Sequence, residues 1–180
     1  MKTMSFLVWS LPILYMLHDF EEIILAEAWT SRYKKEINQC FGNNQPFGLN
    51  YASTYQTPSF ASAIYLAFSM YTVLSLLCII LQNYVLWIGA FVPIFLHFLL
   101  IHIGICFKFK HYVPGLITSI LFIAPSLLCL VIAQQLLQYS LSIWIVASLV
   151  GSFCSLFLMK CLHRLLKSLS NRFNRYSSCL

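Results

Sequence analysis

The chain has few charged residues. Asp, Glu, Lys and Arg make up 9% of its 180 residues, whereas hydrophobic residues make up 60%. Average soluble proteins contain about 25% charged residues, so this composition excludes an ordinary soluble domain. Together with a mean hydropathy of +0.80, it indicates an integral membrane protein.

Several motifs of soluble enzymes and binding proteins are also missing. The sequence has no nucleotide-binding glycine loop, no Ser-His-Asp pattern, no internal repeat and no low-complexity tract. Its seven cysteines form no CxxC pair, and an odd number gives no disulfide framework. The longest polar segment, residues 30–57, is too short for a second domain.

Long apolar runs are what the sequence does contain. Crossing about 30 Å of hydrocarbon takes roughly 20 residues of helix, and an open sheet cannot satisfy its edges in lipid. We therefore predict an all-α, polytopic membrane helix bundle over residues 1–161, followed by a basic cytoplasmic tail over 162–180. Five transmembrane helices are expected, near residues 5–28, 59–81, 85–107, 114–136 and 140–161.

The basic residues set the expected orientation. With five spans, every Lys and Arg except Lys2 falls on one side of the membrane, and the positive-inside rule places that side in the cytoplasm. The N-terminus is then outside and the C-terminus inside. The net charge of +6 is thus explained by topology, and we predict no nucleic-acid partner. We expect residues 163–175, which are basic and amphipathic, to lie as a helix on anionic lipid.

The acidic residues are confined to one short region. All five lie between Asp19 and Glu36, and four of them, with His18, fall inside the first apolar run. An ionisable residue at the bilayer centre costs roughly 2.5–3.5 kcal/mol on insertion scales. This cluster therefore needs protonation, hydrogen bonds or a bound cation, and we interpret it as the functional site.

The spacing of His18, Glu21 and Glu22 suits a metal. On a helix these positions are i, i+3 and i+4, which project from one face. They match the inverted zinc motif H-x-x-E-H, with Glu22 in place of the last His. His18 and Glu22 could then bind a divalent metal, with zinc as the leading candidate, and Glu21 could act as the general base. A zinc hydrolase of the His₂Glu type needs one more His.

Depth in the membrane selects His102 as that third ligand. His18 lies about 13 residues, or roughly 20 Å, below the start of span one, and His102 lies about 17 residues, or roughly 25 Å, below the start of span three. Glu21 and Glu22 lie between these two depths. His97 lies about a turn and a half above His102 and roughly 140° around an α-helix, so it is a weaker binding candidate. Cys106, one turn below His102, could be a soft ligand or part of the core.

A packing role is the alternative for each of these groups. The acids could be protonated and hydrogen-bonded across the bundle, and a lone His in a span is often a packing residue. On an α-helix, Asp19 points away from the face of His18 and Glu22, which favours a supporting role. Glu27 lies near the cytoplasmic end, where water reaches it, and is interpreted as structural.

Two motifs in the chain resemble a known family. His18-x-x-Glu21-Glu22 in a first transmembrane helix is similar to the HXXEE-motif membrane proteins of bacteria and archaea. His102, followed ten residues later by Tyr112-Val113-Pro114-Gly115-Leu116-Ile117-Thr118, looks like that family's His followed by Tyr-x-Pro-Gly and a hydrophobic helix. The resemblance covers about residues 5–135 and implies a small multi-pass protein of the cell membrane without an assigned biochemical function. The family often has Asn about one turn before the second His, where this chain has Phe98; His97 next to it could substitute.

Tyr112, Pro114 and Gly115 also have a physical interpretation of their own. Pro114 suits the first turn of a helix, where no backbone donor is needed, and Gly115 permits close helix approach. Tyr112 is expected at the cytoplasmic interface, on the same side as the acidic cluster, where it could line an entrance to the site.

Three functions fit these observations. The first is a membrane-embedded, zinc-type hydrolase acting on a lipid-like molecule or a membrane-buried peptide, with His18, Glu22 and His102 as metal ligands. The second is proton or cation translocation, because intramembrane carboxylates and His residues form proton relays. The third is a non-catalytic scaffold or regulator in which the motif only ties helices together.

Overall fold

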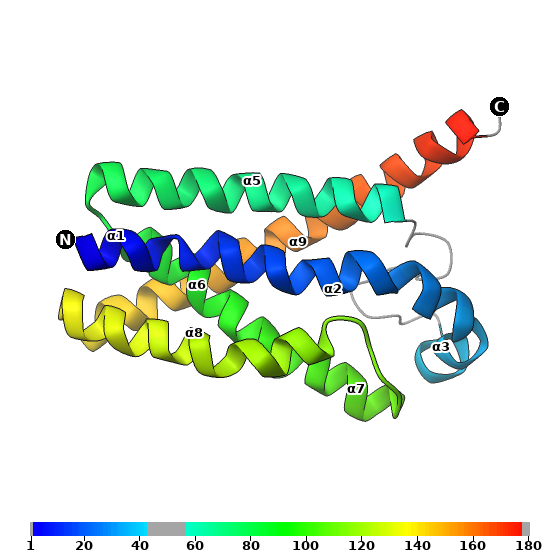
Figure 1. The fold of residues 1–180 in the computed structure, drawn as a ribbon, viewed down its shortest axis with the longest axis horizontal. Helices are drawn as coiled ribbons and strands as arrows, with labels where there is room; N and C mark the ends of the chain where they lie inside the picture. Colours follow the sequence, from blue (N-terminus) through cyan, green and yellow to red (C-terminus); the bar gives the residue numbers. More distant parts are fainter. Residues whose placement is uncertain (1, 43–56, 178–180) are drawn as a thin grey trace.

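The computed structural model of the protein describes residues 2–42 and 57–177, which form helices and no strand (Figure 1). The predicted all-α class is therefore confirmed. From the N-terminus the elements are α1 (Lys2–Val8), α2 (Ser10–Arg32), α3 (Lys34–Phe41), α5 (Thr57–Leu81), α6 (Val85–Leu96), the π-helix η2 (His97–His102), α7 (Ile103–Phe109), α8 (Leu116–Leu137) and α9 (Leu141–Ser177).

Four helical segments are long and apolar enough to cross a membrane. Three of them are α5, α8 and α9 up to Tyr176, and the fourth is the unbroken segment Val85–Phe109, which comprises α6, η2 and α7. These four coincide with the last four of the five predicted spans. The first predicted span corresponds to α1 and α2, where the acidic residues lower the apolar character.

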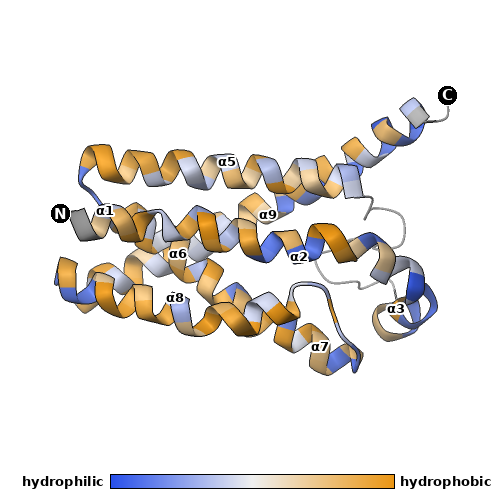
Figure 2. Ribbon diagram, viewed as in Figure 1, coloured by the Kyte–Doolittle hydropathy of each residue, from blue (hydrophilic) through white to orange (hydrophobic). Residues whose placement is uncertain are grey.

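The long helices consist mostly of hydrophobic residues (Figure 2), and many of these are exposed on the outside of the bundle. Large hydrophobic side chains are exposed on α5, α8 and α9, among them Val73, Ile80, Leu121, Leu128, Phe153 and Phe157. Soluble monomers rarely expose contiguous apolar patches above a few hundred Å². In contrast, His18, Asp19 and His102 are buried inside the bundle. This distribution, apolar outside and ionisable inside, supports a membrane protein.

Pro12 shapes the junction between α1 and α2. The two helices meet at Trp9, which is a turn residue between them. Proline has no backbone N–H, so Pro12 leaves the carbonyl of Val8, four residues earlier, without its helical donor. The hydroxyl of Ser75 on α5 donates to that carbonyl at 3.2 Å. This contact helps α2 pack along α5, the arrangement that brings the acidic helix into the bundle.

The last helix is longer than expected. α9 has 37 residues, and its C-terminal end extends beyond the other helices (Figure 1). The segment expected as a separate surface helix after residue 161 is instead a continuation of α9, because no Pro or Gly after Gly151 interrupts it. α9 packs against α6 so closely that a Cβ on Gly151 would overlap the backbone of Gly89. Small residues permit such close contacts between membrane helices.

Candidate metal centre

Four side chains with metal-binding atoms converge inside the bundle: His18, Glu22, His97 and His102. Their donor atoms all lie within 4.8 Å of one another. The Nε2 atom of His102 is central, 3.1 Å from Nε2 of His18 and 2.9 Å from Nε2 of His97. It is also 3.0 Å from Oε1 of Glu22. His102 thus lies beside His18 and Glu22, as the depths of these residues along their helices predicted.

These separations fit a single metal ion. Nitrogen and oxygen atoms that bind zinc tetrahedrally at about 2.0–2.1 Å lie about 3.3 Å from each other. The distances around His102 are close to this value, and Oε1 of Glu22 is 3.5 Å from Nε2 of His18. Without a shared cation, Nε2 of His102 has at most one proton for three contacts of 2.9–3.1 Å. The residues present can therefore hold a metal ion.

The π-helix η2 brings His97 into this group. In an α-helix, residues five apart differ by about 140° in direction, which is why His97 was expected to point away from His102. In η2 the hydrogen bonds run from i to i+5, so residues five apart lie one above the other. His97 and His102 are the first and last residues of η2, and their Nε2 atoms are in contact, 2.9 Å apart. The expectation that His97 points away is corrected by this local geometry.

Glu21 is not part of the group, although its spacing from His18 predicted that it would be. Its Oε2 accepts hydrogen bonds from the backbone N–H of Thr118 at 2.7 Å and from the Thr118 hydroxyl at 2.6 Å. Its Oε1 accepts from the Tyr112 hydroxyl and from the N–H of Ile117 at 3.3 Å. Glu21 thus holds the N-terminus of α8, where unpaired N–H groups and the helix dipole favour a carboxylate.

Thr118 connects Glu21 to the metal-binding group. Its hydroxyl has one proton, which it donates to Glu21, so the same oxygen accepts from Nδ1–H of His18 at 3.0 Å. A His18 ring with its single proton on Nδ1 presents an unprotonated Nε2, the form that binds a metal. Metal-binding His residues commonly donate their second nitrogen to a supporting group in this way. Sequence reasoning did not identify Thr118, although it belongs to the segment after Tyr112 that carries the family resemblance.

Tyr112 supports the same contacts from the connection between α7 and α8. Burial and the hydrogen bond to Glu21 raise the pKa of its hydroxyl above the ordinary value, so the hydroxyl stays protonated and acts as the donor. The backbone carbonyl of Tyr112 also accepts from the indole N–H of Trp29 at 2.6 Å. Tyr112 therefore ties this connection to α2 at two points; it does not line the cavity described below.

Gly115 packs directly against the metal-binding group. It has a positive φ of 86°, which glycine adopts without steric cost. A Cβ at this position would lie 2.5 Å from Cε1 of His102 and 2.9 Å from Oε1 of Glu22. Within the described part of the chain, Nδ1 of His102 has no hydrogen-bond partner. Gly115 therefore packs against the side of the His102 ring on which no hydrogen bond is made.

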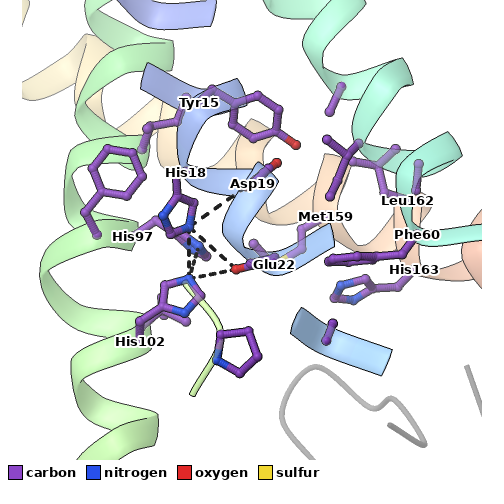
Figure 3. Close-up of a pocket in the computed structure, with 18 of the residues that line it drawn as sticks. Tyr15, His18, Asp19, Glu22, Phe60, His97, His102, Met159, Leu162 and His163 are labelled. Carbon is purple, nitrogen blue, oxygen red and sulfur yellow. Dashed lines mark hydrogen bonds and ion pairs between the residues drawn. The ribbon is translucent and has the colours of Figure 1, made fainter. Parts of the chain in front are cut away.

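A cavity of ≈ 190 Å³ opens beside the group. Figure 3 shows His18, Glu22, His97 and His102 on one side, with Phe60 of α5 and Met159, Leu162 and His163 of α9 opposite them. Most of the remaining lining residues are apolar. A small set of convergent polar groups at the edge of a mostly apolar cavity is typical of a ligand-binding site.

Asp19 and Glu27 lie in different surroundings. Asp19 faces the cavity, contrary to expectation: its Oδ1 is 3.9 Å from Nε2 of His18, and it shares a hydrogen bond with Tyr15. Glu27 accepts from the backbone N–H of Thr57 at 2.8 Å and from its hydroxyl at 2.6 Å. Glu27 thus holds the start of α5, which agrees with the structural interpretation.

Cys106 lies away from the metal-binding group. It is partly buried and packs against an apolar cluster that includes Trp29, Ile37 and Phe109, and it is neither among the four converging residues nor a cavity-lining residue. Of the two possibilities for Cys106, the structure supports the core position.

Comparison with known proteins identifies a family. A family model described as "Protein of unknown function with HXXEE motif" matches residues 9–132, which contain His18, Glu21, Glu22, His102 and Tyr112. No curated protein and no solved structure matches the chain. Because the match covers more than half of the sequence and both motifs, the chain belongs to the HXXEE family.

Proposed function

We propose that this protein is a membrane-embedded, zinc-dependent hydrolase that acts on a lipid-like or membrane-buried substrate. The observation that carries the proposal is the convergence of His18, Glu22, His97 and His102 within 4.8 Å at the edge of an apolar cavity. A bound zinc ion would supply Lewis acidity and lower the pKa of a water ligand to about 7. The cavity would hold the apolar part of the substrate.

The four residues divide into ligands and a proton acceptor. His18, Glu22 and His102 form a His₂Glu set, as in several zinc hydrolases. His97, whose Nε2 lies 2.9 Å from that of His102, would accept the proton. This assignment replaces Glu21 as the base, because both Glu21 oxygens already accept hydrogen bonds from α8 and Tyr112. A base role for Glu21 stays a prediction that this geometry does not favour.

Substitution of two His residues tests this division. We expect purified wild-type protein to retain about one zinc ion per chain by elemental analysis, and His102→Gln to lose it, because Gln is a poor zinc ligand. His97→Gln should keep the metal but lose hydrolysis of a panel of fluorogenic lipid esters by about 100-fold or more. Matched thermal denaturation curves exclude unfolding as the cause. Wild-type protein with no bound metal would contradict the proposal.

A second candidate function is a structural metal site. Four protein ligands complete a tetrahedral zinc site, and closed sites of this kind are structural. The four converging donors would then tie α2 to η2 without catalysis. Replacement of zinc by cobalt distinguishes the two cases, because added azide changes the visible spectrum of an open site and leaves that of a closed site unchanged. In the closed case His97→Gln should also lower the metal content.

We further propose that α1 and α2 form a fifth span, with the N-terminus outside and the C-terminus in the cytoplasm of a bacterial or archaeal cell. The support is the placement of ten of the eleven Lys and Arg residues on one side. In a cysteine-free background, we expect a membrane-impermeant thiol reagent to label Lys2→Cys in intact cells and Tyr176→Cys only after lysis. Labelling of position 176 in intact cells would reverse the orientation.

A further inference from the structure

The helices around the cavity pack against one another on every side but one. The lining residues belong to α2, α5, α9, the connection before α8, and the segment that comprises α6, η2 and α7. α2 packs against α5, α5 against α9, η2 against α8, and α8 against α2. Among the described residues, the close neighbours of α9 are α5 and α6, not η2 or α7. The side between η2 and α9 is therefore the least closely packed wall of the cavity.

The separation of α9 from η2 follows a close contact between helices. At Gly89 and Gly151, α6 and α9 touch through their backbones, so that a Cβ on Gly151 would lie 1.7 Å from the Gly89 carbonyl oxygen. Beyond this contact, α7 and the C-terminal part of α9 run in different directions (Figure 1). The wall between η2 and α9, here called the side opening, is bordered by half-buried residues that line the cavity: Ile101, Ile105, Leu158 and Leu162.

The side opening is apolar. Its four bordering residues are aliphatic, and the two helical segments that carry them are long and apolar enough to cross a membrane. Beside Leu158, the large side chains of Leu156 and Phe157 are exposed, and the first charged residue of α9 is Lys160. Because charged side chains avoid hydrocarbon, we expect lipid chains rather than water at the part of the opening that precedes Lys160.

The size of the cavity limits what can enter it. An apolar cavity of roughly 150 Å³ accepts a benzene-sized ligand, so ≈ 190 Å³ holds a part of a hydrocarbon chain and not a whole lipid. At one end of the cavity, the lining residues Trp29, Val113 and Leu166 are themselves buried, so packed side chains close that end. The rest of a long ligand can therefore leave the cavity through the side opening, where it meets the membrane.

We infer that a hydrocarbon chain of a membrane lipid enters the cavity from the bilayer through the side opening. The end of the chain lies against Ala63 and Ala67 of α5, which are one turn apart and leave space beside their small side chains, and the remainder of the lipid stays in the bilayer. Chain binding depends only on the cavity and the side opening. That this lipid is the substrate rests on the proposed hydrolase function, and the substrate is then a lipid of the bilayer and not a water-soluble ester.

Photo-crosslinking in vesicles tests the inference. The full-length protein is reconstituted into phosphatidylcholine vesicles that contain phosphatidylcholine with a diazirine in one acyl chain, irradiated, and mapped by tandem mass spectrometry. We expect adducts on Ala63 or Ala67, which are 5% and 1% exposed and which lipids around the bundle cannot reach. Adducts on exposed residues of the same helix, such as Val73, serve as the reference. Wild-type protein with adducts on exposed residues alone would overturn the inference.

Blocking the side opening tests the route. Ile101→Trp with Leu158→Trp should reduce the adducts on Ala63 and Ala67, relative to those on Val73, by at least about 10-fold. The same exchanges on the exposed face of α8, Ile120→Trp with Leu127→Trp, should leave this ratio unchanged. Thermal denaturation curves that match wild type show that the blocked variant is folded. An unchanged ratio in the folded, blocked variant would refute entry through the side opening.

Zinc content of the same wild-type samples separates this inference from the proposed hydrolase. Adducts inside the cavity of a protein that binds no zinc would refute the hydrolase and leave chain binding standing. Bound zinc in a protein without such adducts would refute chain binding and leave the metal centre standing.

Discussion

Replacement of Gly115 by alanine is expected to reduce metal affinity by at least about 100-fold. The added Cβ would lie 2.5 Å from Cε1 of His102 and 2.9 Å from Oε1 of Glu22, so two of the proposed ligands must move. Nδ1 of His102 has no partner among the described residues that could hold the ring against this displacement. A non-glycine residue at this positive φ costs a further ~1–2 kcal/mol of folding free energy. Competition with a fluorescent zinc chelator measures the affinity.

Substitutions of two other glycines distinguish the two possible causes of the lower metal affinity, which are displacement of the ligands and strain of the backbone. Gly42→Ala introduces a side chain at a positive φ of 52°, but its Cβ meets only the Asn38 carbonyl, at 4.0 Å; it should lower stability and leave metal affinity unchanged. Gly104→Ala has nothing within 4 Å of its Cβ and should be neutral or slightly stabilising. Wild-type affinity in Gly115→Ala would show that Gly115 does not position the ligands.

Substitutions of Glu21 and Thr118 should also have large effects, of two different kinds. Glu21→Ala removes the acceptor for two N–H groups at the start of α8 and for two hydroxyls, and we expect a loss of about 2–3 kcal/mol in unfolding free energy. Thr118→Val keeps the shape of the side chain but removes the link to His18, so metal affinity should fall about 10- to 100-fold. Denaturant titration and zinc competition measure the two quantities.

Glu21→Gln distinguishes positioning from catalysis. If Glu21 is the base predicted from the motif, Gln should abolish turnover without a change in metal affinity or stability. If Glu21 positions α8 and His18, Glu21→Gln should lower both metal affinity and stability. The amide N–H₂ of Gln is a donor and would face the hydroxyl and N–H groups that donate to the carboxylate oxygen of Glu21. Thr118→Ser, which retains the hydroxyl, should restore the metal affinity lost in Thr118→Val.

The sequence was sufficient for the helices and for part of the site. Composition and run length predicted the four long apolar helical segments, α5, Val85–Phe109, α8 and α9, because a membrane leaves few alternatives to helices. Depth along the helices placed His102 near His18, since a fixed rise of about 1.5 Å per residue is independent of the details of packing. The ligand roles of these residues stay predictions until a metal is measured.

The remaining site geometry depends on features that a helical repeat does not contain. His97 joins the group only because η2 is a π-helix, and that local change in hydrogen bonding is not visible as a period in the sequence. Glu21 and Glu22 are neighbours and so point about 100° apart on α2; which one meets the His residues depends on α8, whose N-terminus takes Glu21. Those contacts are tertiary, and the spacing within the motif could not specify them.

The exposed face of α9 has a consequence for how the proposed hydrolase would obtain water. Up to Phe157 its large exposed side chains are apolar, and Lys160, Arg164 and Lys167 follow. Since charged side chains avoid the hydrocarbon, we expect the boundary of the bilayer core near Lys160. Met159 and His163 of the cavity wall are within one turn of that boundary. At this depth lipid carbonyl groups already meet water, so a reaction that consumes water needs no channel through the bundle to supply it.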